Sequence, residues 1–463
     1  MSRADPATAK DSLTAALPGW LLISFMVTLV VPILLPAGPF TLSPHRLFLI
    51  LMFVPMVGLL FMERAGTVRA IDWLMIGSAL WAVLSFMANH PISRAIEPAG
   101  IYVVESLGAY MLGRLAVRNR DDFLLLVKTM FLICLFLLPF ALIEGLTGRN
   151  ILLSAIPRSI GEVNIGERLG IHRVQSVFSH PILFGAFVST GLGLFWYAQR
   201  PLAGFAGRIP TGILPVVATF FSMSTGALIA LVVQFVLIGW ELVMRTVKTR
   251  WRIFAWGTVA TYILLEFVTE VSPFHTLVRY ASLNQGSAYN RILIFNYGMD
   301  NVWANPVFGL GLRDWVRPGF MGSSVDNFWL LTAMRHGVPA FLMMAAAIYL
   351  LIRKTAMVEL SDPKAAACRA AFLTSLGGLI VAGGTVHYWH TMFSFVLFFI
   401  GSGVWIMDQD KAEEATQTQE DSVPSPAAGT PYSRFPPKPA ASARRLGAST
   451  PASAAIRARS PRS

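Results

Sequence analysis

Apolar runs about as long as a lipid bilayer is thick recur along this sequence of 463 residues. A helix needs about 20 apolar residues to cross the hydrocarbon core, and the chain has enough runs for about twelve such helices. Because the core offers no water to the backbone, each run is expected to be helical. We therefore predict an all-α, polytopic membrane protein. The runs lie at residues 20–35 and near residues 55, 80, 108, 133, 187, 217, 234, 262, 341, 376 and 397.

Charge is scarce and lies between these runs. Only 13% of the residues are charged, against roughly 25% in soluble proteins, which excludes a soluble domain or a small disulfide-linked module. A net charge of +12 would suit nucleic acid, but the basic residues cluster in alternate short loops, so no nucleic acid partner is predicted. The positive-inside rule then puts both termini in the cytoplasm. The basic loops hold Arg64 and Arg69; Arg114, Arg118 and Arg120; Arg200 and Arg208; Arg245, Lys248, Arg250 and Arg252; and Arg353, Lys354 and Lys364.

The same pattern predicts the domain organisation. A cytoplasmic N-terminal segment, residues 1–18, precedes a multi-pass membrane domain at residues 19–407. Two outer loops, at about residues 147–176 and 272–325, are much longer than the others, and long loops in compact domains are usually functional. Residues 408–463 are rich in Ala, Pro and Ser, which predicts a disordered, basic cytoplasmic tail.

Three features are interpreted as having no chemical role. Cys134 and Cys368 lie inside apolar runs and are expected to be packing residues. Asp408 and Asp410 have the Asp-x-Asp spacing of some metal sites, but at the start of a tail they are expected to be solvated. The His387-Tyr-Trp-His stretch is expected to be part of an interfacial aromatic belt.

The first outer loop gathers basic side chains just before an apolar run: Arg168, His172, Arg173 and His180. These arginines could simply extend towards lipid headgroups. Positive charge is disfavoured on the outer side, however, so its presence there favours an anionic ligand. A guanidinium group is well suited to a phosphate because it can donate two parallel hydrogen bonds.

The second outer loop contains a predicted amphipathic helix from Ala288 to Trp303. Ile292, Phe295, Met299 and Trp303 recur at helical spacing, which predicts a helix that lies along the membrane surface. Arg291 lies near its start, where it would be a surface charge if no partner were present. Asn305-Pro306 ends the helix, and Gly309 and Gly311 predict a flexible turn.

Two ionisable residues mark the entry to the next apolar run. Asp326 is expected near the bilayer boundary, either as a helix N-cap or as a functional carboxylate. His336 lies about three helical turns deeper, where a polar contact between helices is the simpler interpretation.

The order of these motifs resembles the O-antigen ligase and Wzy-type polysaccharide polymerase family of bacterial inner-membrane proteins. The resemblance spans roughly residues 140–350. The motifs are Arg173-x-x-x-x-Phe178-x-His180-Pro181, Ser224-x-Gly226-Ala227, Asn290-Arg291, Asn305-Pro306-x-x-Gly309-x-Gly311, and Asp326-Asn327 followed by Gly337. The resemblance implies a GT-C-like membrane glycosyltransferase that acts at its periplasmic loops.

Family members take a glycan from a polyprenyl (undecaprenyl) diphosphate and move it to a glycan acceptor without metal or nucleotide. By resemblance, this chain would be an inverting hexosyltransferase with no cofactor, in which Arg173 and Arg291 hold the diphosphate. Asp326 replaces the family's histidine as the base, with His180 or His336 as alternatives. Substrate-binding positions would be Arg168, His172, His180, Arg313, Asn327 and His336.

The Asp326-Asn327 form, with Arg-His-Gly-Val-Pro following, favours an exopolysaccharide polymerase over a ligase to a non-polymer acceptor. Membrane lipids, and a flippase and a chain-length regulator of the same pathway, would be its partners. A transporter of the same lipid-linked glycan is the alternative from another class, but the spans carry few of the midplane charges that transporters use.

Overall fold

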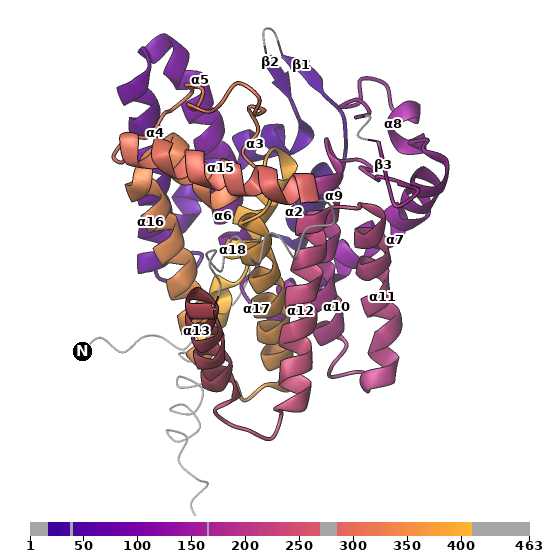
Figure 1. The fold of residues 1–463 in the computed structure, drawn as a ribbon. Helices are drawn as coiled ribbons and strands as arrows, with labels where there is room; N and C mark the ends of the chain where they lie inside the picture. The colour runs from indigo at the N-terminus through magenta and orange to yellow at the C-terminus, as the bar shows by residue number, and fades with distance from the viewer. Residues whose placement is uncertain (1–16, 38–39, 164–165, 269–284, 410–463) are drawn as a thin grey trace, which may run out of the picture. The chain divides into compact units, whose positions relative to one another are not determined.

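The fold is almost entirely helical, as the sequence predicts (Figure 1). The computed structural model describes residues 17–37, 40–163, 166–268 and 285–409. The predicted tail from residue 410 and residues 269–284 of the second outer loop therefore lie outside the described residues. Strands in the described ranges form two short antiparallel hairpins: β1 (Leu35–Ala37) with β2 (Phe40–Leu42), and β3 (Glu167–Arg168) with β4 (Ile171–His172).

Eight helical segments of the described residues are long and apolar enough to cross a membrane. They are α3 (Pro44–Phe61), α4 (Ala70–Asn89), α7 (Arg120–Thr147), α9 (Pro181–Ser189) with α10 (Gly191–Ala198), α12 (Thr225–Val243), α16 (Phe328–Met357), α17 (Pro363–Gly383), and α18 (Thr391–Gly401) with the 3₁₀ helix Val404–Asp408. This confirms a polytopic membrane protein.

The other predicted spans are also helical but shorter, interrupted or less apolar. They are α2 (Gly19–Thr28), α11 (Phe205–Phe221), α13 (Arg250–Val268), and α5 (Ile92–Val103) joined to α6 (Ala109–Ala116) by a π-helical turn, Val104–Gly108. A count of twelve spans therefore stays a prediction. One short helix, α8 (Ile151–Ala155), and one long one, α15 (Gln285–Ala304), belong to the outer loops.

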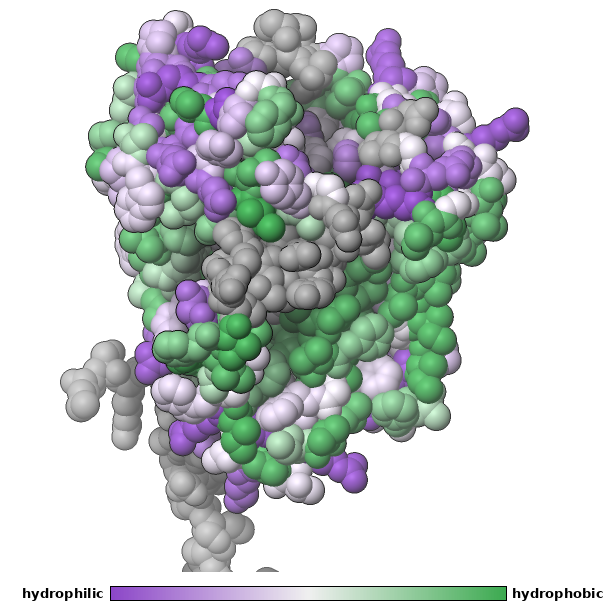
Figure 2. Space-filling model, viewed as in Figure 1, coloured by the Kyte–Doolittle hydropathy of each residue, from purple (hydrophilic) through white to green (hydrophobic). Residues whose placement is uncertain are grey.

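Hydrophobic side chains cover the outside of the bundle. Figure 2 shows hydrophobic surface over α11 and α12, and mostly hydrophilic surface around α15 above them. On α12, Val232, Phe235 and Val236 are each about half exposed. An apolar surface of this extent on a folded protein needs an apolar environment, and lipid supplies it for helices of this length.

The second outer loop is fixed to a break in α16. Gly337 has φ 83° and ψ 165° in the middle of that helix, a conformation essentially restricted to glycine. At the break, Val338 N donates to Pro306 O (2.8 Å), Leu310 N donates to Met334 O (2.7 Å) and Gly311 N donates to Arg335 O (2.9 Å). The turn predicted to be flexible is thus hydrogen-bonded backbone to backbone, and that prediction was wrong.

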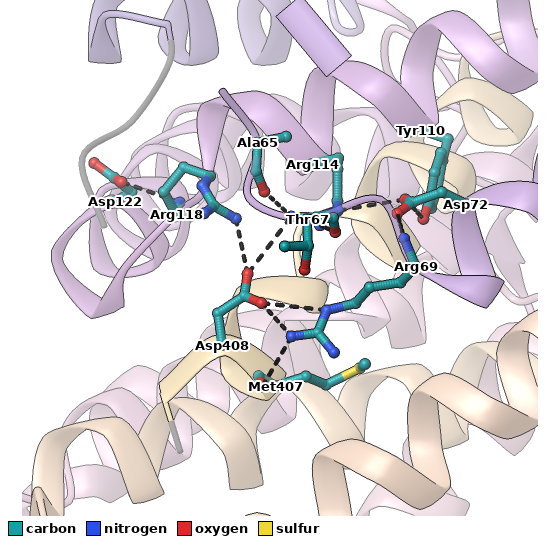
Figure 3. A network of polar contacts seen from close by, with 10 residues as sticks. All are labelled: Ala65, Thr67, Arg69, Asp72, Tyr110, Arg114, Arg118, Asp122, Met407 and Asp408. Atoms are coloured by element: carbon teal, nitrogen blue, oxygen red, sulfur yellow. Dashed lines mark hydrogen bonds and ion pairs between the residues drawn. The ribbon is translucent and has the colours of Figure 1, made fainter. Parts of the chain in front are cut away.

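A buried ionic network joins the last helical turn to the loops after α3 and α6 (Figure 3). Asp408 accepts hydrogen bonds from Arg69 and from Arg118 (2.9 Å), while Asp72 accepts from Tyr110 (2.6 Å) and Arg114 (3.3 Å). The Asp408 side chain is only 13% exposed. The expectation of a solvated Asp408 was therefore wrong, and the predicted boundary at residue 408 falls inside a packed helical turn.

Replacing Gly337 with Ala should destabilise the fold. A Cβ at this position would overlap the carbonyl oxygen of Val307, and the backbone conformation alone costs a non-glycine residue about 1–3 kcal/mol. Thermal unfolding in detergent measures the loss. Gly239→Ala is the matched control, because a Cβ on that helical glycine meets open space. Equal melting temperatures for the two variants would contradict the proposed constraint.

Candidate functional site

One cavity collects side chains from five separate stretches of the chain. It has a volume of about 330 Å³ and is lined by the first outer loop with the start of α9, the start of α12, α15, the segment before α16, and the segment between α17 (Pro363–Gly383) and α18 (Thr391–Gly401). Five of the predicted site residues line it together with residues that were not predicted. The lining residues are Arg168, Arg173, His180, Ile182, Ser224, Thr225, Arg291, Ser324, Asp326 and Trp389.

A buried carboxylate holds the loop that carries Arg173. Glu144, near the end of α7, accepts hydrogen bonds from Gln175 N (2.8 Å), Ser176 N (3.0 Å) and Asn150 Nδ2 (3.0 Å). Asn150 Nδ2 also donates to Ser176 O (2.7 Å). Gln175 and Ser176 lie two and three residues after Arg173. By binding their N–H groups, Glu144 fixes where this loop enters the cavity.

Two hydroxyl groups form another wall of the cavity at the start of α12. Ser224 and Thr225 are 1% and 2% exposed, and within the described ranges neither side-chain oxygen has a hydrogen-bond partner. Buried polar atoms are rarely left unsatisfied in folded proteins. Arg168 fixes the edge of this wall, because its guanidinium donates to Met223 O (2.9 Å). These hydroxyls suit a polar ligand.

Arg291 reaches the cavity because it lies on the buried face of α15. Ala288, Arg291, Ile294 and Asn301 are all buried, whereas Trp303 is 67% exposed. The predicted helix is confirmed, and the face that packs on the bundle includes Arg291 and Asn301. Arg291 is accordingly no simple surface charge.

Asp326 does not cap α16, because its neighbour does. Asn327 is the N-cap, and its Oδ1 accepts a hydrogen bond from Leu330 N (3.0 Å). Asp326 is thereby left to line the cavity, where its Oδ1 accepts a hydrogen bond from Ser324 Oγ (2.9 Å). It is the only carboxylate among the residues that line this cavity in the described part of the chain.

The electrostatic environment favours an anion. Burial lowers the pKa of Arg173 to about 10, with further lowering by the charges of Arg168 and Arg291. Burial likewise lowers the pKa of Arg168 and of Arg291. Three guanidinium groups and one carboxyl group line the cavity among the described residues, so basic groups are in excess there. A bound anion would relieve this repulsion.

His180 is neutral and is oriented by its own helix. It is the N-cap of α9, and its Nδ1 accepts a hydrogen bond from Ile182 N (3.1 Å). Burial, and next the charge of Arg173, lowers the pKa of this imidazole to about 4. In the neutral ring the proton is thus assigned to Nε2, which is a hydrogen-bond donor and not a base.

Residues 210–345 match the family model described as O-Antigen ligase, so this part of the chain is similar to O-antigen ligases. The matched segment contains Ser224, Arg291 and Asp326, while Arg168, Arg173 and His180 precede it. None of the curated proteins compared with this chain matches it. This match, together with the candidate membrane spans, supports an integral membrane enzyme of glycan transfer in an O-antigen or polysaccharide pathway.

Four predicted substrate-binding residues lie outside the cavity. His172 lies in the β3–β4 hairpin, with its Nε2 3.3 Å from Glu167. Asn327 caps α16. His336 is buried against the rings of Phe86 and Tyr102, at centroid distances of 5.1 and 4.6 Å. Arg313 lines a separate cavity and donates to Asn89 Oδ1 (2.7 Å).

Sequence reasoning missed the contribution of residues 386–390. Val386 and Tyr388 are fully buried, Trp389 lines the cavity, and its ring lies 5.6 Å from that of His180. These residues pack within the protein and contribute to the cavity, whereas their interpretation as an interfacial belt stays a prediction. The sequence signal was the concentration of four large polar or aromatic rings between two apolar runs, which fits a packed site as well as a membrane interface.

Glu144→Gln should loosen the loop that carries Arg173. An amide has one acceptor oxygen where the carboxylate has two, so at least one buried N–H loses its partner, at a cost of about 1–3 kcal/mol. We expect lower thermal stability together with weaker binding of inorganic pyrophosphate. Glu241→Gln is the control, because that carboxylate pairs with Arg200 at the other end of α12. Unchanged pyrophosphate affinity in the Glu144 variant would show that this anchor does not position Arg173.

Proposed function

We propose that this protein is a polymerase that joins glycan repeat units carried on polyprenyl diphosphate, at the outer face of the bacterial inner membrane. The proposal rests on one observation: among the described residues, three arginines and one carboxylate line the same cavity of a chain whose residues 210–345 match the O-antigen ligase model. Both termini would be cytoplasmic, and the donor would be the undecaprenyl form. A ligase that uses a non-polymer acceptor has the same site chemistry and is the alternative.

Arg173 and Arg291 hold the diphosphate of the donor, with Arg168 beside them. Each phosphate of a diphosphate diester carries a negative charge, and more develops on the leaving group as its bond to the sugar breaks. Fixed cations in a partly desolvated cavity stabilise that charge more effectively than water does. The hydroxyls of Ser224 and Thr225 and the Nε2–H of His180 supply uncharged donors to the same oxygens.

Asp326 acts as the general base. Its carboxylate takes the proton of the acceptor hydroxyl while that oxygen bonds to the anomeric carbon. The bond between this carbon and the diphosphate oxygen breaks, polyprenyl diphosphate leaves, and attack from the opposite side inverts the anomeric centre. His180 and His336 are poorer candidates, because the first presents a donor and the second lies outside the cavity. No metal ion takes part in these steps.

Arg173→Ala should weaken pyrophosphate binding and reduce glycan transfer by about 10²–10³-fold, the usual cost of removing one charge-stabilising donor. Arg173→Lys should restore part of both, since it keeps the charge but not the planar fork. The assay is polymer formation by purified protein in detergent with lipid-linked donor, where transport cannot produce a new bond. Arg149→Gln, at an exposed arginine outside the cavity, is the control. Full activity of Arg173→Ala would refute its role.

Asp326→Asn should lower the transfer rate by about 10²–10⁴-fold, the usual contribution of a general base. Pyrophosphate should bind as well as before or better, because the variant removes a negative charge from an anion site. Asp326→His, which restores the family's histidine, should retain more activity than the asparagine variant. Asp300→Asn, at an exposed carboxylate on α15, controls for charge. A normal rate in Asp326→Asn would require another base.

A further inference from the structure

A second, smaller cavity adjoins the first. It has a volume of about 160 Å³, and Ser324 lines both cavities. Because Ser324 Oγ also donates to Asp326 (2.9 Å), a molecule held in the second cavity lies one side chain away from the proposed base. Arg313, Asp314, Trp315, Arg335 and His387 line the second cavity along with apolar residues of α16.

The walls of this second cavity are held in place by the fold. Val316 N donates to Asn301 Oδ1 (2.9 Å), and Asn301 Nδ2 donates to Val316 O (2.8 Å), so the loop is fixed to α15. Trp315 Nε1 donates to Ser323 O (3.0 Å), which closes the loop on itself. On the opposite wall, Arg335 O accepts from Gly311 N and from Ser85 Oγ (both 2.9 Å).

Arg335 is the available cation of the second cavity. Within the described ranges its guanidinium has no hydrogen bond or ion pair, and the side chain is exposed. Arg313 donates to Asn89 and Leu310 O, and Asp314 pairs with Arg317 (2.8 Å). Burial, and next the charge of Arg335, lowers the pKa of His387 to about 3, so that ring is neutral. A carboxylate is the natural partner for such an isolated guanidinium.

We propose that the second cavity binds the acceptor glycan, and that Arg335 contacts a carboxylate on a sugar close to the reacting hydroxyl. This inference rests on the proposed function, since it places the acceptor beside Asp326. The reacting hydroxyl of the acceptor extends past Ser324 into the first cavity, while the carboxylated sugar remains in the second cavity. The enzyme would therefore select acceptors that contain a uronic acid or another carboxylated sugar.

The test uses the full-length protein in detergent and two small probes. Methyl glucuronide, with methyl glucoside as its uncharged match, reports on the second cavity by ligand-observed NMR, and inorganic pyrophosphate reports on the first by calorimetry. Wild type should bind the glucuronide in preference to the glucoside, with or without pyrophosphate. Arg335→Gln should weaken glucuronide binding about tenfold or more, Arg335→Lys should keep much of it, and Arg149→Gln should not change it.

The outcomes separate the two proposals. Equal binding of both sugars, or glucuronide binding that survives in Arg335→Gln, would overturn the acceptor site. Glucuronide that competes with pyrophosphate and depends on Arg173 would also overturn it, because the sugar would then occupy the first cavity. Normal pyrophosphate binding by Arg335→Gln shows that this variant is folded. If wild type does not bind pyrophosphate at all, the proposed diphosphate site fails, whatever the result with the glucuronide.

Discussion

Repulsion among arginines is the constraint that the cavity between α12, α15 and α16 has to overcome. Arg168, Arg173 and Arg291 line one cavity with a single carboxylate, and burial opposes the charge on each of them. Like charges in such a place would separate if their backbones were free to move. The fold prevents this by attaching each stretch of chain to a helix of the bundle. Contacts outside the cavity thus offset the repulsion between the three guanidinium groups.

Those attachments are made by uncharged backbone groups and by one buried carboxylate. Glu144 orders the loop of Arg173, the buried face of α15 carries Arg291 inwards, and Asn327 caps α16 so that Asp326 remains available. None of these contacts involves the cavity directly. The basic side chains of the site are thereby held in position before a substrate binds, so substrate binding does not have to offset the entropy lost in ordering them.

The sequence predicted the architecture well because hydropathy reports directly on the environment of each helix. Residues 44–61, 70–89 and 120–147 are confirmed as helices able to cross a membrane. The motifs also pointed to Arg173, Arg291 and Asp326, which the structure places around one cavity. The roles of these residues stay predictions, since geometry shows proximity and not chemistry.

The errors came from residues whose partners are distant in the chain. Asp408 looked solvated because Arg69 and Arg118 lie about three hundred residues earlier. Arg291 could be interpreted as a surface charge because the sequence does not show which face of α15 packs on the bundle, whereas the structure buries it. The role proposed for Arg335 could not be predicted from the sequence, because its lack of a partner among the described residues is evident only from the folded structure.

The break in α16 has a consequence for how this protein can vary. Gly309, Gly311 and Gly337 all have positive φ, and the backbones that contain them are joined by hydrogen bonds. A Cβ on Gly309 would crowd the carbonyl of Met334, and one on Gly337 would overlap that of Val307. These three glycines are therefore expected to vary together. A related sequence with a larger residue at one of them would need a different backbone path for the whole junction, including the wall that carries Arg335.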